Sequence, residues 1–164
     1  MRLMAARALA ATAILWSATI FAAAYAGGRM HGAVSSSLAA VVYGIGRVLC
    51  HQRPERSFHL WSVQLPVCAR CTGIYVGAAG AALAVLTGLA HVDSRAHLSQ
   101  TTRAARRMVS PLLALILAAS PALATLVYEW TTGAMPSNGI RAASGVVLGG
   151  AVMAVLLAEV RDGR

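Results

Sequence analysis

Long apolar blocks alternate with short polar connections along this chain, and the blocks predict helices that cross a membrane. The stretches 8–26, 72–90, 109–128 and 140–159 contain almost no charged residue. A helix needs roughly 20 mainly apolar residues to cross a hydrocarbon core about 30 Å thick, and each stretch has that length. We therefore expect four transmembrane helices, joined by connections that carry most of the arginines.

The segment 34–49 has a different pattern, because its apolar residues recur at the spacing of one helical face. Polar side chains such as Ser35 and Arg47 lie largely elsewhere on that helix. This pattern predicts an amphipathic helix along the membrane surface or against the bundle. The segment 50–71 follows as a polar connection, interrupted by Pro54 and Pro66.

The first apolar stretch is typical of either a retained helix or a signal peptide. It follows Arg2 and Arg7, and the triplet 24–26, Ala-Tyr-Ala, resembles a cleavage site. We favour a retained helix, because the stretch is longer than the roughly 7 to 15 residues of a signal core. Residues 1–164 are then expected to form a single membrane domain.

Small residues four positions apart mark the second and fourth spans. Gly73 and Gly77 form one such pair, and Gly145 and Gly149 form another. Small residues at this spacing allow helix backbones to approach closely in lipid. We therefore expect these two spans to pack together, and we expect a kink near Pro121 in the third.

Composition supports the membrane assignment. Hydrophobic residues make up 58% of the chain and charged residues 12%, whereas soluble domains have roughly 45 to 50% and about 25%. All 14 basic residues are arginine and the net charge is +9, yet only 5% of residues are aromatic. Because base-stacking platforms are scarce and the arginines flank apolar runs, we expect a lipid bilayer and no nucleic acid as the partner.

With four spans, both termini lie on the same side of the membrane. The two ends of the chain and the connection 91–108 carry eight arginines, whereas the opposite side carries six. The positive-inside rule then places both termini in the cytoplasm and the segment 50–71 outside it. We expect a multi-pass protein of the cell membrane, meaning the inner or plasma membrane.

Three cysteines, Cys50, Cys68 and Cys71, lie in the connection 50–71. An odd number of cysteines cannot form a closed set of disulfides within one chain. The spacing of Cys68 and Cys71 allows two sulfurs to bind one tetrahedral ion, and Cys50 with either His51 or His59 would complete a Cys₃His set. This predicts a site for zinc or another thiophilic metal at the membrane surface.

Two other interpretations of the cysteines stay open. A Cys-x-x-Cys pair at the start of a helix, next to Arg70, favours a reactive thiolate, as in a membrane thiol-disulfide oxidoreductase with Cys50 as resolving partner. Alternatively, the cysteines pack or form a Cys68–Cys71 disulfide in a structural or partner-binding membrane protein. No nucleophile and base pair, carboxylate dyad or phosphate-binding glycine loop is present, so no catalytic residue is assigned and the enzyme question stays open.

Two further sets of polar residues are candidates for binding. Arg56, Ser57 and Arg70 could contact an anion or a lipid headgroup near the cysteines, or lie solvated in the connection. Glu129 and Arg141 could form an interfacial ion pair, because charges at membrane depth are costly unless they are paired. Alternatively, both extend separately to the interface.

The motifs around the cysteines resemble those of a prokaryotic membrane-protein family known as domain of unknown function 2085. The similar segments are 50–52 (Cys-His-Gln), 56–58 (Arg-Ser-Phe), 65–75 (Leu-Pro-Val-Cys-Ala-Arg-Cys-Thr-Gly-Ile-Tyr) and 136–141 (Pro-Ser-Asn-Gly-Ile-Arg). The resemblance covers roughly residues 40 to 155 and implies a multi-helix membrane fold with these cysteines as its signature. It implies no activity. One departure is Ser62, where the family pattern leads us to expect glycine.

Overall fold

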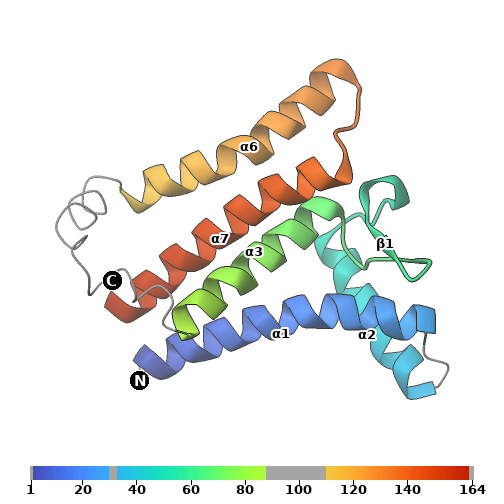
Figure 1. The fold of residues 1–164 in the computed structure, drawn as a ribbon, viewed down its shortest axis with the longest axis horizontal. Helices are drawn as coiled ribbons and strands as arrows, with labels where there is room; N and C mark the ends of the chain where they lie inside the picture. The colour runs from blue at the N-terminus through green and yellow to red at the C-terminus, as the bar shows by residue number, and fades with distance from the viewer. Residues whose placement is uncertain (1, 30–32, 88–109, 163–164) are drawn as a thin grey trace.

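A computed structural model describes residues 2–29, 33–87 and 110–162, and nearly all of these residues are helical. Figure 1 shows long helices side by side, with a short two-stranded hairpin at one end. The elements in chain order are α1 (Arg2–Arg29), α2 (Ala33–Leu49), the 3₁₀ turn η1 (Pro54–Arg56), β1 (His59–Leu60), β2 (Val63–Gln64), α3 (Ala69–Leu86), α6 (Pro111–Thr132) and α7 (Asn138–Asp162).

Four of the described helices, α1, α3, α6 and α7, are long and apolar enough to cross a membrane. This confirms the predicted all-α membrane fold with four spans and one shorter helix. The ends differ from the expected ones by a few residues. Helix α3 begins at Ala69 rather than residue 72, which places Cys71 in its first turn. The expected end of this span at residue 90 lies outside the described residues.

The spans alternate in direction along the chain. In Figure 1, α1 and α6 run towards the hairpin and α3 and α7 run away from it, so both termini lie at the opposite end of the molecule. This arrangement agrees with an even number of membrane crossings. Which end faces the cytoplasm stays a prediction, and the connection 91–108 on which it partly rests lies outside the described residues.

Helices α3 and α7 form the most extensive contact in the molecule. A Cβ atom on any of four glycines would overlap a backbone carbonyl oxygen of the other helix. The pairs are Gly73 with Ala142, Gly77 with Val146, Gly145 with Arg70, and Gly149 with Ile74. The prediction of close packing between the second and fourth spans is therefore confirmed, and lipid-buried helices associate in this way where small residues let backbones approach.

Helix α1 covers this pair along its length. Near the termini, its Ala6 and Ala10 pack with Ala82, Met153 and Leu157. At the hairpin end, its Ile20 and Ala24 pack with Leu65 and Val67. By contrast, α6 buries little surface, and its exposed leucines are suited to contact with lipid.

Helix α2 turns its small residues inward and its large ones outward. Ala39, Val42 and Gly46 are buried, whereas Val41 and Val48 are exposed. The sequence pattern correctly predicted the helix, but most of its large apolar side chains do not face the bundle. Such side chains can face hydrocarbon, because lipid tails solvate apolar groups as well as a protein interior does.

Candidate metal centre

The connection between α2 and α3 folds into a compact unit at one end of the bundle. It contains η1 and an antiparallel hairpin in which His59 pairs with Gln64 and Leu60 with Val63. Trp61 and Ser62 form the two-residue turn, both with positive φ, 52° and 64°. Two-residue hairpins favour such turns, which glycine adopts most easily. The sequence pattern does not predict this hairpin, because strands of two residues are too short to show an alternation of apolar and polar side chains.

Cys50 is held by the end of α2. Its backbone N–H donates to the Gly46 carbonyl, with 2.8 Å between nitrogen and oxygen. Gly46 lies directly against the Pro66 carbonyl, and a Cβ atom there would overlap it. The absence of a side chain at Gly46 therefore lets the end of α2 approach the start of α3 closely.

Gln52 joins the same two segments through its side-chain amide. It donates to the carbonyls of Tyr43, at 2.9 Å, and Pro66, at 2.6 Å. Gln64 in turn donates to the Gln52 carbonyl at 2.7 Å. The bonds to the Gln52 and Pro66 carbonyls satisfy backbone groups of the irregular connection, and the bond to Tyr43 ties this connection to α2. Together they join the end of α2 to the residues that precede Cys68.

The three cysteine sulfurs form one cluster. They lie within 4.8 Å of one another, and no disulfide joins them. Bonds of about 2.3 Å to one tetrahedral ion would separate the sulfurs by roughly 4 Å. The cluster is thus close to the geometry that a shared metal ion requires. All three cysteines are partly buried, and Cys50 and Cys71 pack against the apolar residues Ile20, Ala24, Leu65 and Val67.

The surroundings of Cys68 favour the thiolate form of its side chain. It is the N-cap residue of α3, at the positive end of the helix dipole. A hydrogen bond with the Cys71 side chain, together with backbone and Cys50 hydrogen bonds, outweighs burial and lowers the pKa of Cys68 to about 5. A thiolate at this position is both a metal ligand and a nucleophile.

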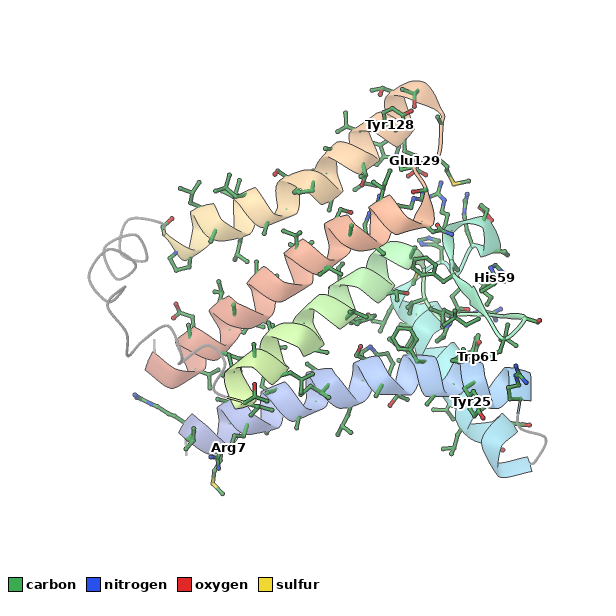
Figure 2. All side chains as sticks on the ribbon, in the orientation of Figure 1. Arg7, Tyr25, His59, Trp61, Tyr128 and Glu129 are labelled. Carbon is green, nitrogen blue, oxygen red and sulfur yellow. The ribbon has the colours of Figure 1, made fainter. Side chains whose placement is uncertain are left out.

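The structure does not bring either predicted histidine into the cluster. His51 and His59 are exposed, and neither belongs to the group of ligand atoms within 4.8 Å of one another in the described part of the chain. His51 directly follows Cys50, and side chains of adjacent residues diverge in extended backbone. Figure 2 shows His59 on the hairpin. The ligand atoms that gather in the described residues are the three sulfurs, and a histidine as fourth ligand stays a prediction.

Three of the other predicted polar residues, Arg56, Arg70 and Arg141, lie around Glu129. The two oxygens of Glu129 accept ion pairs from separate arginines: Arg56 Nη2 at 2.5 Å and Arg141 Nη2 at 2.7 Å. Figure 2 shows Glu129 near the end of α6, on the side towards the start of α7. Arg70 donates to Thr125 Oγ1 at 2.9 Å. Glu129 and Arg141 form an ion pair and both are buried in the protein, whereas the position of this pair at the membrane interface stays a prediction.

Ser57 is buried and forms a separate set of hydrogen bonds. It is only 2% exposed, and its Oγ donates to the Arg53 carbonyl at 3.0 Å and accepts from Gln64 at 3.2 Å. Asn138, at the start of α7, donates to the Ser57 carbonyl at 3.1 Å. The hydrogen bond to the Ser57 carbonyl thus joins the connection between α2 and α3 to the start of α7.

Several residues of this site were not singled out by the sequence analysis. The position of the connection depends on three of them, Gln52, Asn138 and Gly46. The fourth, Thr125, accepts a hydrogen bond from Arg70. Gln52 and Asn138 were within the motifs quoted above, so the motifs contained a signal for them. Gly46 and Thr125 had none, because their partners are distant in the sequence.

Comparison with known proteins finds a family of membrane proteins whose model covers the motifs around the cysteines. The model of a family described as "Predicted membrane protein (DUF2085)" matches residues 50–155. An uncharacterised protein of Methanothermobacter thermautotrophicus is 56% identical over 32 residues, which cover 20% of this chain and 29% of that protein. An uncharacterised protein of Methanocaldococcus jannaschii is 47% identical over 36 residues, which cover 22% of this chain and 23% of that protein.

The match spans less than a third of the length of each of these two relatives. No solved structure matches the chain.

Proposed function

This chain belongs to the DUF2085 family of predicted membrane proteins, and we propose that it binds one thiophilic metal ion through Cys50, Cys68 and Cys71. The observation that carries the proposal is the gathering of the three sulfurs within 4.8 Å of one another. Two of them come from a single helix start and the third from the end of another helix, so the set is assembled by the fold.

The surroundings of the sulfurs support a bound cation. When all three cysteines lose their protons, the partly buried thiolates would repel one another, and a metal ion would offset both that repulsion and the cost of removing the charges from water. The Cys68 backbone N–H donates to the Cys50 sulfur at 3.3 Å. Contacts of this kind to a ligating group orient it and tune the metal.

Zinc is the first candidate for the ion, because thiolates bind it well and it accepts tetrahedral sulfur ligands. Copper(I) is the second, because soft thiolates select it too. With three protein ligands a zinc ion keeps a fourth position for water or another molecule, as in sites that exchange ligands. A histidine in this position, either His51 or His59, would complete the Cys₃His set that the sequence predicts.

The test is metal analysis combined with thiol titration on protein purified without oxygen. We expect about one ion per chain, lost in Cys50→Ser, Cys68→Ser and Cys71→Ser. Retention of the ion in both His51→Ala and His59→Ala would give a Cys₃ site. Its loss in one of these variants would give a Cys₃His site with that histidine as the fourth ligand. Absence of an ion together with three titratable thiols would contradict the proposal.

A second candidate function is thiol-disulfide oxidoreduction at Cys68 and Cys71. It is favoured by the hydrogen bond between the two side chains and by the lowered pKa of Cys68. Oxidation of the two thiols would form one disulfide and release two protons and two electrons, with a membrane quinone as the electron acceptor. In the metal analysis this function predicts a reducible disulfide and no ion. An oxidising outer compartment would favour that outcome.

A further inference from the structure

Three arginines from three separate elements converge on one carboxylate beside the thiol cluster. Arg56 comes from η1, Arg70 from the first turn of α3 and Arg141 from the first turn of α7. Arg56 and Arg141 form ion pairs with Glu129, and Arg70 also acts on it electrostatically. We call these four residues the arginine cluster.

The charges of the arginine cluster do not balance. Three guanidinium groups face one carboxylate, and guanidinium groups stay protonated in proteins. Glu55, the neighbouring acid in η1, is exposed, and within the described ranges Glu129 is the only acid paired with these arginines. The cluster therefore holds two more positive than negative charges in a largely buried place.

Some hydrogen-bond donors of the arginine cluster also lack an acceptor. The Nε atoms of Arg56, Arg70 and Arg141 are all buried, and none has a hydrogen-bond partner. One buried acceptor, Glu129 Oε1, also lacks a hydrogen bond, although it forms the ion pair with Arg56. Arg141 itself is only 2% exposed. Native proteins rarely leave buried donors without an acceptor, and an ion that completes the site is one of the accepted explanations. Because the cluster has three such donors and one such acceptor, donors are in excess, which indicates a missing acceptor.

The fold adds positive potential at the same place. Helices α3 and α7 both begin at this end of the bundle, whereas α6, which carries Glu129, ends there, so the positive ends of two helix dipoles and the negative end of one point towards it. Helix N-termini bind phosphate groups in many proteins. Here that tendency coincides with an excess of guanidinium groups, whose planar donors match phosphate oxygens in pairs.

We propose that the arginine cluster binds a phosphate group, carried either by an anionic phospholipid or by free phosphate. Free phosphate, with close to two negative charges, would balance the excess charge, and a phospholipid phosphodiester, with one negative charge, would balance half of it. Either would supply acceptors for the unpartnered donors. Arg56, whose side chain is 35% exposed, is the residue through which the ligand reaches the cluster. This site uses residues other than the three cysteines and does not depend on a bound metal.

The experiment measures binding to the full chain in nanodiscs. In discs of phosphatidylcholine, inorganic phosphate is titrated and followed by calorimetry. In parallel, native mass spectrometry of discs that mix phosphatidylcholine with phosphatidylglycerol reports which lipid is retained. Titration by inorganic phosphate identifies free phosphate as the source, and selective retention of phosphatidylglycerol identifies the lipid headgroup. Absence of both overturns the proposal.

The decisive variant is Arg56→Gln, and its matched control is Arg53→Gln, an exposed arginine of the same connection. We expect Arg56→Gln to weaken binding at least tenfold and Arg53→Gln to leave it unchanged. Arg56→Lys keeps the charge towards Glu129 but lacks the paired donors, so it should fold and bind with intermediate strength. Equal effects of Arg56→Gln and Arg53→Gln would show a diffuse charge effect and would overturn the site.

Metal content and thermal stability are measured on the same preparations. If Arg56→Gln keeps the native metal content and melting temperature, its loss of phosphate binding reflects the arginine cluster itself. If Arg56→Gln unfolds, phosphate binding by Arg56→Lys tests the proposal instead. Binding by Arg56→Lys as strong as that of the unchanged protein would contradict recognition of phosphate by the paired donors of Arg56. Loss of metal in Cys68→Ser with phosphate binding preserved would separate this site from the metal proposal.

Discussion

The backbone N–H of Cys68 donates a hydrogen bond to the sulfur of Cys50, with 3.3 Å between nitrogen and sulfur and 18 positions between the residues. This contact closes the connection between α2 and α3. The sulfur of Cys50 accepts this hydrogen bond at the start of α3, where Cys68 and Cys71 also lie. The site therefore depends on how closely the end of α2 approaches the start of α3.

Gly46 controls that approach, so Gly46→Ala should weaken metal binding about tenfold, as expected for a residue that positions a ligand. The added methyl group would overlap the Pro66 carbonyl and push Cys50 away from Cys68. Gly44→Ala, where a Cβ atom has no neighbour within 4 Å, is the matched control. Competition with a coloured zinc chelator measures the affinity. Equal affinities of the two variants would show that the α2 contact does not set the site.

Helix packing gives a second prediction, for Gly77→Leu. A leucine side chain would collide with the Val146 carbonyl of α7 and separate the two spans. We expect a clear loss of the folded, monodisperse protein in detergent, followed by size-exclusion chromatography and thermal melting. Gly80→Leu, on the same helix but with open space around it, should behave like the unchanged protein. An unaltered melting temperature for Gly77→Leu would contradict the packing.

The hairpin turn gives a third prediction, for Ser62→Gly. Ser62 has φ of 64°, a left-handed conformation that costs a residue with a Cβ atom about 1 kcal/mol and glycine almost nothing. Ser62→Gly should therefore stabilise the protein by about that amount, measured by thermal or denaturant unfolding. Ser62→Ala keeps the Cβ atom and should bring no gain. A gain as large in the alanine variant would exclude backbone strain as its cause.

Thiol reactivity gives a fourth prediction. Because the pKa of Cys68 is lowered to about 5, its thiolate form dominates above that pH. In metal-free protein, alkylation of Cys68 by iodoacetamide should rise through pH 5 and level off by neutral pH, whereas an ordinary thiol titrates near 8.5. Cys71→Ala removes the main hydrogen bond and should move the transition upwards. Mass spectrometry of the Cys68 peptide gives the rates. A transition near pH 8 in both proteins would contradict the hydrogen-bond effect.

Glu129 gives a fifth prediction. Glu129→Gln leaves the buried Arg141 without its counter-charge, and breaking a buried ion pair in this way costs about 3 kcal/mol. The melting temperature in detergent should fall clearly. Glu55→Gln removes a charge from an exposed residue nearby and should have little effect. If phosphate is bound, added phosphate should partly restore the stability lost in Glu129→Gln, because its charge opposes the same arginines.

The helices of this protein could be predicted from its sequence because the bilayer imposes a simple condition. In hydrocarbon each backbone polar group must be paired within the segment, so uncharged runs of about 20 residues become helices. The pairing of Gly73 and Gly77 with α7 was predictable for a related reason, since only small residues let backbones meet. Helix ends were less predictable: α3 begins at Ala69, and Cys68 in the N-cap position makes no side-chain capping hydrogen bond that would mark this start.

The candidate site was only partly predictable. The Cys-x-x-Cys spacing already placed two sulfurs together. It could not decide which other donor would join them. His51 and His59 had the right chemistry, but the Gly46–Pro66 contact brings only the Cys50 sulfur to the helix start, while both histidines stay exposed.

The sequence by itself determined the membrane-spanning helices and the local pair of cysteines, because both follow from neighbouring residues and a uniform apolar solvent. Tertiary structure alone decided that Arg56, Arg70 and Arg141 surround Glu129 and that Cys50 completes the sulfur cluster. These contacts join residues from separate elements. Their geometry depends on helix packing that is set by backbone contacts such as Gly46 with Pro66, which no local pattern encodes.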